Sequence, residues 1–201
     1  VICATDEQKK IISKFNNKVF PILDFNDKYF KQKKQNYNIK KKIKISWEGL
    51  PENIVQLKEI KSSLLKLSRE FNIELVIITD SYYYKFLRSI IKIDTKKYLE
   101  EILGDEIQFR HVEWKIGTYF KEIINTDFVV IPINLDDKLV AGKPENKLLH
   151  LWKLKMPVIT SETSAYKRTM NKAGLNHYAK NDDNFYKLCK RFIQNKHLRI
   201  I

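Results

Sequence analysis

Four polar residues, Lys143, Glu145, Asn146 and Lys147, stand at the start of a stretch whose apolar residues recur at helical spacing. Those apolar residues are Leu148, Leu149, Leu151, Trp152 and Leu154. The first turn of a helix presents free N–H groups and the positive end of the helix dipole, and both attract anions. A carboxylate there can accept from two hydroxyls, while ammonium groups neutralise phosphates. The pattern therefore favours a ligand that carries a diol and a diphosphate.

The elements around this helix predict a repeating strand–helix unit. Phe128–Ile133 is short and β-rich, and Pro132 ends its hydrogen-bonded ladder. Pro144 suits the first helical position, because its φ is already helical and its missing N–H costs nothing there. The segments that follow are a strand over Pro157–Thr160, a turn over Ser161–Ser164 and a helix over Tyr166–Ala173. This order is typical of a parallel α/β sheet, which binds ligands outside the carboxyl ends of its strands.

The residues upstream repeat the same alternation. The expected elements are strands over Ile43–Trp47, Glu74–Thr79 and Glu106–Val112, helices over Asn53–Phe71, Asp94–Leu103 and Lys115–Asn125, and a final helix from Asp182 or Asp183 to about Gln194. We therefore expect residues 43–201 to form a doubly wound, mostly parallel, Rossmann-like α/β sheet with helices on both faces. Gly49 follows the first strand, where glycine lets backbone approach a phosphate, although turns need glycine anyway.

Residues 1–42 are expected to stand apart from this sheet. Val1–Ala4 predicts a strand, Asp6–Phe15 a helix with Thr5 as its cap, and Val19–Leu23 another strand. They suggest the end of an upstream domain or a crossover, and a strand at the very start suggests a piece of a longer chain. Asp24–Lys42 shows no clean period and predicts a surface loop or linker.

Composition places the chain among globular proteins with a strong basic excess. The 201 residues are 43% hydrophobic and 31% charged, with a net charge of +14. No apolar run approaches the ~20 residues that span a bilayer, no secretory signal is visible, and Cys3 and Cys189 form no redox spacing. We expect a cytoplasmic protein, peripheral to a membrane at most. The charge indicates either phosphate-bearing partners or an A+T-rich coding sequence.

The basic segment leaves three readings open. Residues Lys28–Lys44 are rich in lysine. Four aromatic residues lie among these lysines or next to them: Phe25, Tyr29, Phe30 and Tyr37. This combination could stack on single-stranded nucleic acid or lie on an anionic membrane. A solvated connection is favoured over both, because runs of charge usually face water. Nucleic acid is therefore not expected as a partner.

Several kinds of active site are excluded by their motifs. The sequence contains no G-x-S-x-G, P-loop, H-E-x-x-H, C-x-x-C or G-x-G-x-x-G. Asp136-Asp137 and Asp182-Asp183 could hold Mg²⁺, but the second pair suits a helix cap, and we expect no metal site and no cofactor. His111, near a strand end, is interpreted as structural, as are the other scattered histidines. Tyr82–Tyr84 follow a strand and are expected to pack rather than bind a ligand.

The run IP…KPENKLLHLWKLKMPVITSETSAYKRTMNKAG resembles the donor-nucleotide, C-terminal half of a GT-B glycosyltransferase, with a similarity that extends over roughly Ile43–Ile193. In that family a strand ends in Pro at the cleft, and a loop leads to a helix that opens with Glu or Asn-Lys before a Met-Pro-Val strand. Asp137 and Glu145 are similar to the E-x7-E of many retaining members, with Asp replacing the first Glu, although the usual Gly-Phe-Gly is absent.

The resemblance implies a nucleotide-diphosphate sugar as donor and an acceptor glycan or lipid-linked glycan, in cell-surface glycan synthesis. It implies that Glu145 holds the ribose, and that Asn146, Lys147 and the helix N-terminus meet the diphosphate. The remaining implied contacts are Gly49 near the diphosphate, Trp114 at the base, Pro132 at the cleft, and Asp137, Ser161, Thr163 and Ser164 at the sugar. Lys143 and Lys147 would stabilise the departing diphosphate.

Two other classes of function are weighed against this one. The chain could be a non-catalytic α/β binding module, which would be the case for a donor half that lacks its acceptor domain. It could also be a nucleic-acid binder that uses Lys28–Lys44. If the glycosyltransferase reading holds, Glu145→Ala is expected to weaken nucleotide binding without unfolding the domain.

Overall fold

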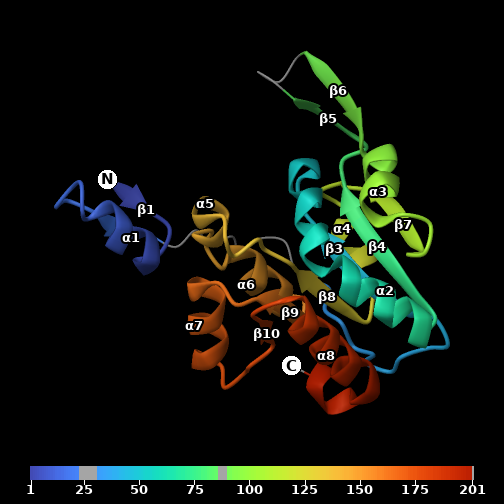
Figure 1. Ribbon diagram of the computed structural model, residues 1–201. Helices are drawn as coiled ribbons and strands as arrows, with labels where there is room; N and C mark the ends of the chain where they lie inside the picture. Colours follow the sequence, from blue (N-terminus) through green and yellow to red (C-terminus); the bar gives the residue numbers. More distant parts are fainter. Residues whose placement is uncertain (23–30, 86–89, 201) are drawn as a thin grey trace.

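A six-stranded parallel sheet forms the centre of the computed structural model, which describes residues 1–22, 31–85 and 90–200 (Figure 1). Its strand order is β10-β9-β8-β3-β4-β7, and every neighbouring pair is parallel. The strands are β3 (Ile43–Glu48), β4 (Ile73–Thr79), β7 (Phe109–Glu113), β8 (Phe128–Ile131), β9 (Val158–Ser161) and β10 (Tyr178–Ala179). The predicted parallel α/β sheet is therefore confirmed.

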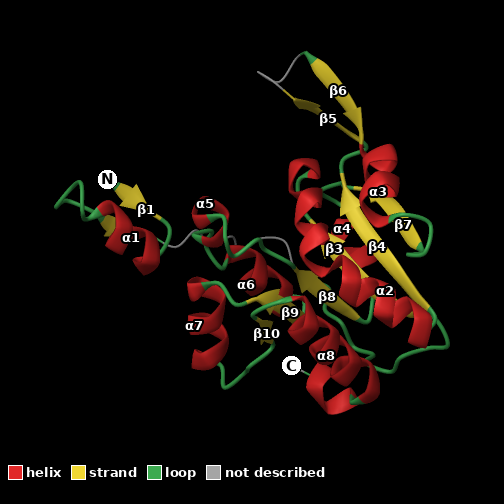
Figure 2. Ribbon diagram, viewed as in Figure 1, coloured by secondary structure: helices red, strands yellow, loops and turns green. Residues whose placement is uncertain are grey.

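Helices cover both faces of this sheet, as the sequence predicts (Figure 2). The helices are η1 (Pro51–Ile60, a 3₁₀ helix), α2 (Lys61–Glu70), α3 (Thr95–Leu103), α4 (Tyr119–Ile124), α5 (Lys138–Ala141), α6 (Asn146–Lys153), α7 (Ser164–Lys172), α8 (Asp182–Gln194) and η2 (Lys196–Arg199, 3₁₀). Apolar residues of η1, α2, α3 and α8 share one buried cluster with the sheet, and those of α4, α6 and α7 share the other. The strands read as continuous apolar runs because both of their faces are buried.

The long helix predicted over Asn53–Phe71 is two helices of different pitch. Ile54, Leu57 and Ile60 are buried at a spacing of three residues, which a 3₁₀ helix places on one face. From Ile60 the buried positions continue at Leu64 and Leu67, which is α-helical spacing. The spacing of the buried apolar residues thus changes where η1 passes into α2.

Other boundaries differ for local reasons. Pro144 is not the first helical residue, because α6 begins at Asn146 and Glu145 stands at the position before it. Asn181, rather than Asp182, caps α8 through a bond from Asn184 N. Gly117 lies in a turn, so α4 begins only at Tyr119. Sequence reasoning also missed the short elements α5 and β10.

An antiparallel pair of strands, β5 (Tyr82–Lys85) and β6 (Ile91–Asp94), stands away from the main sheet in Figure 1. Sequence reasoning missed this pair. Tyr83 is buried and its ring lies 6.1 Å from that of Tyr98. Tyr82 and Tyr84 are exposed, so the expectation that all three tyrosines pack is wrong for these two. The alternation of a strand sends them to the opposite face from Tyr83.

The amino-terminal residues form a small strand–helix–strand unit of β1 (Ile2–Cys3), α1 (Asp6–Ile12) and β2 (Phe20–Pro21), close to the expected segments. Thr5 caps α1, as predicted. The unit contacts the main sheet's helices, since Gln8 Nε2 donates to Gly142 O at 3.0 Å and Glu7 pairs with Arg168 of α7. The strand–helix–strand pattern is therefore present and docked.

The basic segment is only partly a solvated connection. Lys34 is buried, and its Nζ donates to Thr126 O at 2.6 Å. Residues 31–40 contain no helical turn. Phe25, Lys28, Tyr29 and Phe30, which the nucleic-acid reading uses, lie outside the described residues. Within the described ranges, no helix is long and apolar enough to cross a bilayer.

Phe128→Ala is expected to lower the free energy of unfolding by about 3–5 kcal/mol, because the side chain is fully buried and its loss leaves a cavity. The ring of Phe128 packs edge-on against Phe192 of α8, with centroids 5.6 Å apart. Urea denaturation measures the change. Leu139→Ala, at an 89% exposed position, is the control and should stay within about 0.5 kcal/mol of the parent. Equal effects at both positions would contradict this packing.

His177 should make the fold sensitive to mild acid. Burial, with a smaller contribution from Arg191, lowers the pKa of His177 in the folded state, and its ring lies 4.7 Å from that of Phe192. At a pH below the ordinary pKa of histidine, the unfolded chain binds a proton at His177 that the folded chain does not bind. The free energy of unfolding therefore falls as the pH falls. Urea denaturation between neutral pH and pH ~5 should show a smaller loss for His177→Gln than for the parent. Exposed His197→Gln should keep the parent's slope.

Candidate functional site

A cavity of about 510 Å³ opens at the carboxyl ends of β3 and β8, where the strand order reverses. The chain winds from β3 outward through β4 to β7, then returns to β8 and winds the other way through β9 to β10. In doubly wound sheets this switch point is where ligands bind. The cavity is lined by Trp47, Glu48, Gly49, Leu50, Asn53, Gln56, Asp80, Trp114, Ile131, Pro132, Ile133, Lys143, Pro144, Asn146, Lys147 and Tyr166.

Two lysines from the loop before α6 and its first turn bring positive charge to the cavity. Lys147 Nζ donates to Glu48 O at 2.6 Å and lies 3.7 Å from Glu48 Oε2. Lys143 Nζ donates to Asn53 Oδ1 at 2.9 Å. Partial burial lowers the pKa of Lys143, and the neighbouring charge of Lys147 adds to that effect. Two ammonium groups held close together in a cavity attract an anion more strongly than either does alone.

Gly49 brings the backbone after β3 close to Lys147. A Cβ at position 49 would lie 3.0 Å from the Trp47 ring and 3.1 Å from Lys147 Nζ. These contacts are tighter than ordinary packing, so a larger residue would displace the ring or the ammonium group. Glycine at position 49 therefore leaves room for the Trp47 ring and for the end of the Lys147 side chain.

Aromatic and proline side chains form the apolar part of the wall. Trp114 follows β7 and stacks on Tyr119, with ring centroids 5.4 Å apart and planes 25° apart. Pro132 follows β8 and joins it in lining the cavity. Burial raises the pKa of Tyr166, which therefore stays protonated as a donor. An apolar wall beside polar groups is usual for ligand cavities.

Asn146 carries a polar atom that the protein itself does not satisfy. Its Oδ1 is buried and has no hydrogen-bond partner among the described residues. Buried polar atoms nearly always have a partner, so an orphaned acceptor in a cavity wall indicates a donor brought by a ligand or by water. Asn146 is the first residue of α6, where free N–H groups also gather.

The sequence-predicted site residues divide between this cavity and its surroundings. The cavity contains Gly49, Trp114, Pro132, Lys143, Asn146 and Lys147. Outside its lining are Asp137, Glu145, Ser161, Thr163 and Ser164. The structure brings the first group together around one space, and the binding role of each of these residues stays a prediction.

Local bonds account for the polar side chains outside the cavity. Asp137 is exposed and caps α5, with Oδ1 accepting from Leu139 N and Val140 N. Ser161 Oγ accepts from Ile133 N at 2.7 Å, which links β9 to the end of β8. Thr163 caps α7, with its side chain accepting from Tyr166 N. Ser164 is the first residue of α7.

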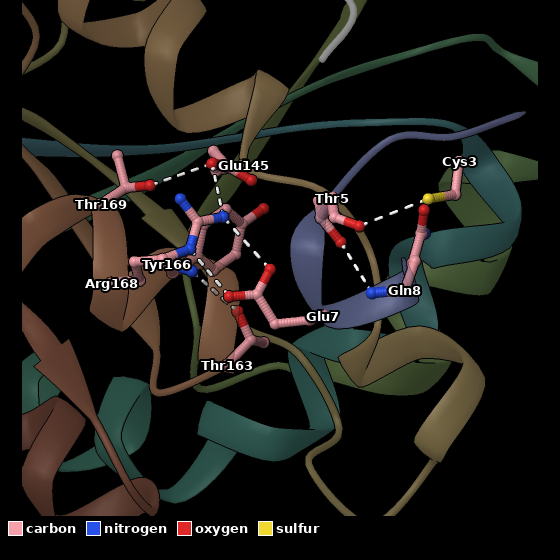
Figure 3. Close-up of polar contacts among 9 residues, drawn as sticks. All are labelled: Cys3, Thr5, Glu7, Gln8, Glu145, Thr163, Tyr166, Arg168 and Thr169. Carbon is pink, nitrogen blue, oxygen red and sulfur yellow. Dashed lines mark hydrogen bonds and ion pairs between the residues drawn. The ribbon is translucent and has the colours of Figure 1, made fainter. Parts of the chain in front are cut away.

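Glu145 lies at the centre of a charged cluster that connects three helices (Figure 3). Its side chain is 4% exposed, and Oε1 accepts from Arg168 Nη2 at 2.9 Å and from Thr169 Oγ1 at 3.1 Å. Arg168 Nε also donates to Glu7 of α1 at 2.7 Å. Glu145 Oε2 is buried without a partner among the described residues. The Glu145 carboxylate, which the resemblance implies holds the ribose, is bonded in this structure to Arg168 and Thr169 of the protein itself.

Sequence reasoning did not single out several polar residues of the cavity. Asn53 and Gln56 come from the first turns of η1, and Glu48 and Asp80 from the ends of β3 and β4. The signal for Asp80 was available, since it directly follows the buried strand Ile73–Thr79. Asn53 and Gln56 fall within the helix expected over Asn53–Phe71, and the sequence pattern does not predict the 3₁₀ pitch of this part, which places both at the cavity.

The described residues contain no cluster of three or more histidine, cysteine or acidic side chains that could hold a metal ion. His111 Nε2 lies 3.1 Å from Thr79 O, between neighbouring strands, which agrees with the structural interpretation of this residue. The two acidic pairs of the sequence lie apart, with Asp137 capping α5 and Asp182 accepting from Ser63 N.

Arg168→Met is expected to destabilise the fold by about 3 kcal/mol, because it leaves the buried carboxylate of Glu145 without its charged partner. Adding Glu145→Gln removes that unpaired charge, so the double variant should be more stable than Arg168→Met alone. Urea denaturation of the parent, both single variants and the double variant measures the coupling. Strictly additive effects would show that Arg168 and Glu145 do not depend on each other.

No family model and no curated protein matches the chain, whereas solved structures do. Staphylococcus aureus TarM, as a G117R mutant in complex with fondaparinux, alpha-GlcNAc-glycerol and UDP, matches with a TM-score of 0.63 and 14% identity, over 99% of this chain and 38% of TarM. A second TarM structure matches with a TM-score of 0.64 and 13% identity, over 99% of this chain and 37% of TarM. WaaG, a glycosyltransferase involved in lipopolysaccharide biosynthesis, matches with a TM-score of 0.58 and 14% identity, over 98% of this chain and 54% of WaaG.

This chain thus spans less than two thirds of the length of the proteins it matches. At such low identity the likeness establishes the fold and nothing finer. These neighbours are GT-B glycosyltransferases, and the chain matches a portion of them that resembles their C-terminal domain. The fold that the resemblance implied is confirmed: a parallel, Rossmann-like α/β sheet of the GT-B C-terminal type.

Proposed function

We propose that the cavity at the switch point binds the nucleoside diphosphate of a nucleotide sugar, and that this chain is the donor half of a glycosyltransferase. The observation that carries the proposal is the pair Lys143 and Lys147 beside the orphaned acceptor of Asn146, all lining one cavity. The shared fold with glycosyltransferases, including a TarM structure that contains UDP, supports it.

The charges of the cavity suit a diphosphate bonded to a sugar. Lys143 and Lys147 supply positive charge where the phosphates would lie, and the start of α6 adds free N–H groups. Asp80 and Glu48 supply carboxylates, which accept from hydroxyls. Trp114 and Pro132 give an apolar wall for a base. A diphosphate alone would meet unfavourable carboxylates, and a ligand with both phosphates and hydroxyls satisfies the whole lining.

The same lysines serve the chemical step in this proposal. Cleavage of the sugar–phosphate bond leaves negative charge on the departing diphosphate. Lys143 and Lys147 stabilise that charge as it develops, and groups fixed in a partly dry cavity do so without reorganising. No metal ion takes part, and the nucleotide sugar is the only cofactor-like ligand. The acceptor is a glycan or lipid-linked glycan, and an acceptor-binding domain would supply the catalytic base if the reaction uses one.

The finer parts of the proposal concern the surroundings of the cavity. Glu145 holds the ribose, and Asp137, Ser161, Thr163 and Ser164 touch the sugar. We place the reaction in the cytoplasm, at most peripheral to a membrane, in cell-surface glycan synthesis. Residues 43–201 form the donor domain, and residues 1–42 are either the end of an upstream domain or a crossover into this one.

Calorimetric titration with UDP, GDP, ADP and CMP tests the proposal. One nucleoside diphosphate should bind with saturation, with the same affinity with and without Mg²⁺. Lys147→Met should lower that affinity roughly 10- to 100-fold, because a charge-assisted hydrogen bond contributes about 1.5–3 kcal/mol.

Lys172→Met is the matched control, because Lys172 is exposed in the last turn of α7, at the opposite end of that helix from its carboxyl-edge start. It removes the same charge and should leave the affinity unchanged. Absence of binding to all four nucleotides, or an equal loss in both variants, would overturn the assignment of the cavity. Nucleotide binding without transfer or hydrolysis of any nucleotide sugar would favour a non-catalytic binding module.

A further inference from the structure

A second cavity lies at the amino ends of the strands, on the edge of the sheet opposite the first. It has a volume of about 330 Å³. Its lining is Lys33, Lys34, Gln35, Asn36, Asn38, Lys40, Lys42, Lys44, Ile124, Asn125 and Asp127. The length of β3, Ile43–Glu48, places it roughly 17 Å from the nucleotide cavity, at about 3.3 Å per residue.

The segment that forms this cavity, residues 31–44, is attached to the protein at several points. Lys34 N donates to Leu154 O at 2.8 Å, and Lys34 Nζ donates to Thr126 O and Ile124 O. Tyr37 OH donates to Lys155 O at 3.0 Å, and Arg199 Nη2 donates to Tyr37 O at 3.0 Å. These bonds hold the lysines of the segment around one space, which a solvated linker would not do.

The charge of this cavity is almost entirely positive. Residues 31–44 contain no acidic residue. Of the nearby carboxylates, Glu74 pairs with Lys42 at 2.7 Å, and Asp127 Oδ2 accepts from Lys44 N at 2.7 Å. Lys33 and Lys40 have no ion pair with any residue that the structure describes, and both are exposed. The amino edge therefore holds lysines that are still available to an anion.

The amide side chains in the lining indicate what kind of anion fits this cavity. Gln35, Asn38 and Asn125 line the same space, and amides bind hydroxyls as well as phosphate oxygens. Tyr37 is the only aromatic residue in 31–44, and Lys34 Nζ lies over its ring, 5.8 Å from the centroid. Recognition of single-stranded nucleic acid depends on aromatic stacking platforms, and this segment offers a single ring that a lysine already contacts. The lining fits a compact phosphate ester that carries hydroxyls.

We propose that this cavity is a second anion site, distinct from the nucleotide cavity, which binds a hydroxyl-bearing phosphate ester. The phosphate sits among Lys33, Lys40 and Lys44, with the charge of buried Lys34 behind it. The ester can come from a soluble molecule or from a phospholipid headgroup, since both present the same chemistry. This site does not depend on the proposed glycosyltransferase activity.

The test uses two probes and a pair of variants matched in charge. The probes are glycerol 1-phosphate, followed by calorimetry, and phosphatidylcholine vesicles with or without phosphatidylglycerol, followed by co-sedimentation. Lys33→Gln/Lys40→Gln should weaken binding roughly fivefold for each lysine removed near an anionic surface. Lys97→Gln/Lys172→Gln lowers the net charge equally at exposed positions on α3 and α7 and should bind as the parent does.

The two probes distinguish the source of the ester. Binding of glycerol 1-phosphate supports a site for a soluble ester, and binding only of phosphatidylglycerol vesicles supports a lipid headgroup. Absence of binding to both probes, or an equal loss in the two double variants, would overturn the proposal and leave the charge as general composition. Tighter binding of a single-stranded oligonucleotide than of either probe would also overturn it, in favour of nucleic acid.

Discussion

The pairing of β3 with β8 is the interaction on which the rest of the molecule depends. It joins the two halves of the sheet, β3-β4-β7 and β8-β9-β10, through the register Ile45↔Phe128 and Ser46↔Val129. Asp127 reinforces it, because its N–H donates to Lys44 O and its carboxylate accepts from Lys44 N, both at 2.7 Å. Because the two halves wind in opposite directions from this seam, their helices diverge and leave a cavity at its carboxyl end.

The same seam organises the electrostatics of both edges. At the carboxyl edge Lys143 and Lys147 meet the end of β3, and at the amino edge Lys44 and the attached segment 31–44 surround the start of it. Lys143 donates to Asn53 Oδ1 and Lys147 to Glu48 O, while buried Lys34 donates to Ile124 O and Thr126 O. Part of the +14 net charge is therefore concentrated at two built cavities, and the remainder is spread over exposed lysines.

The cluster around Arg168 connects the amino-terminal unit with the wall of the cavity at the switch point. Arg168 contacts Glu7 of α1 and Glu145, and Glu145 directly precedes Asn146 and Lys147 of the cavity wall. A buried carboxylate is tolerated only with a partner, and the guanidinium provides it. The docking of residues 1–22 and the burial of the Glu145 carboxylate therefore depend on the same guanidinium group.

The order of apolar and polar residues is enough to predict the parallel sheet and the edge of it where polar groups gather. Apolar runs such as Ile73–Thr79 predict strands buried on both faces, and helical spacing after Lys147 predicts the helix that brings two lysines to the carboxyl edge. Tertiary structure decided the remainder. Arg168 is distant in sequence from Glu7 and Glu145, so no local pattern reveals that it pairs with both. Likewise, only packing shows that Lys34 is buried and that a three-residue spacing turns Asn53 and Gln56 toward the cavity.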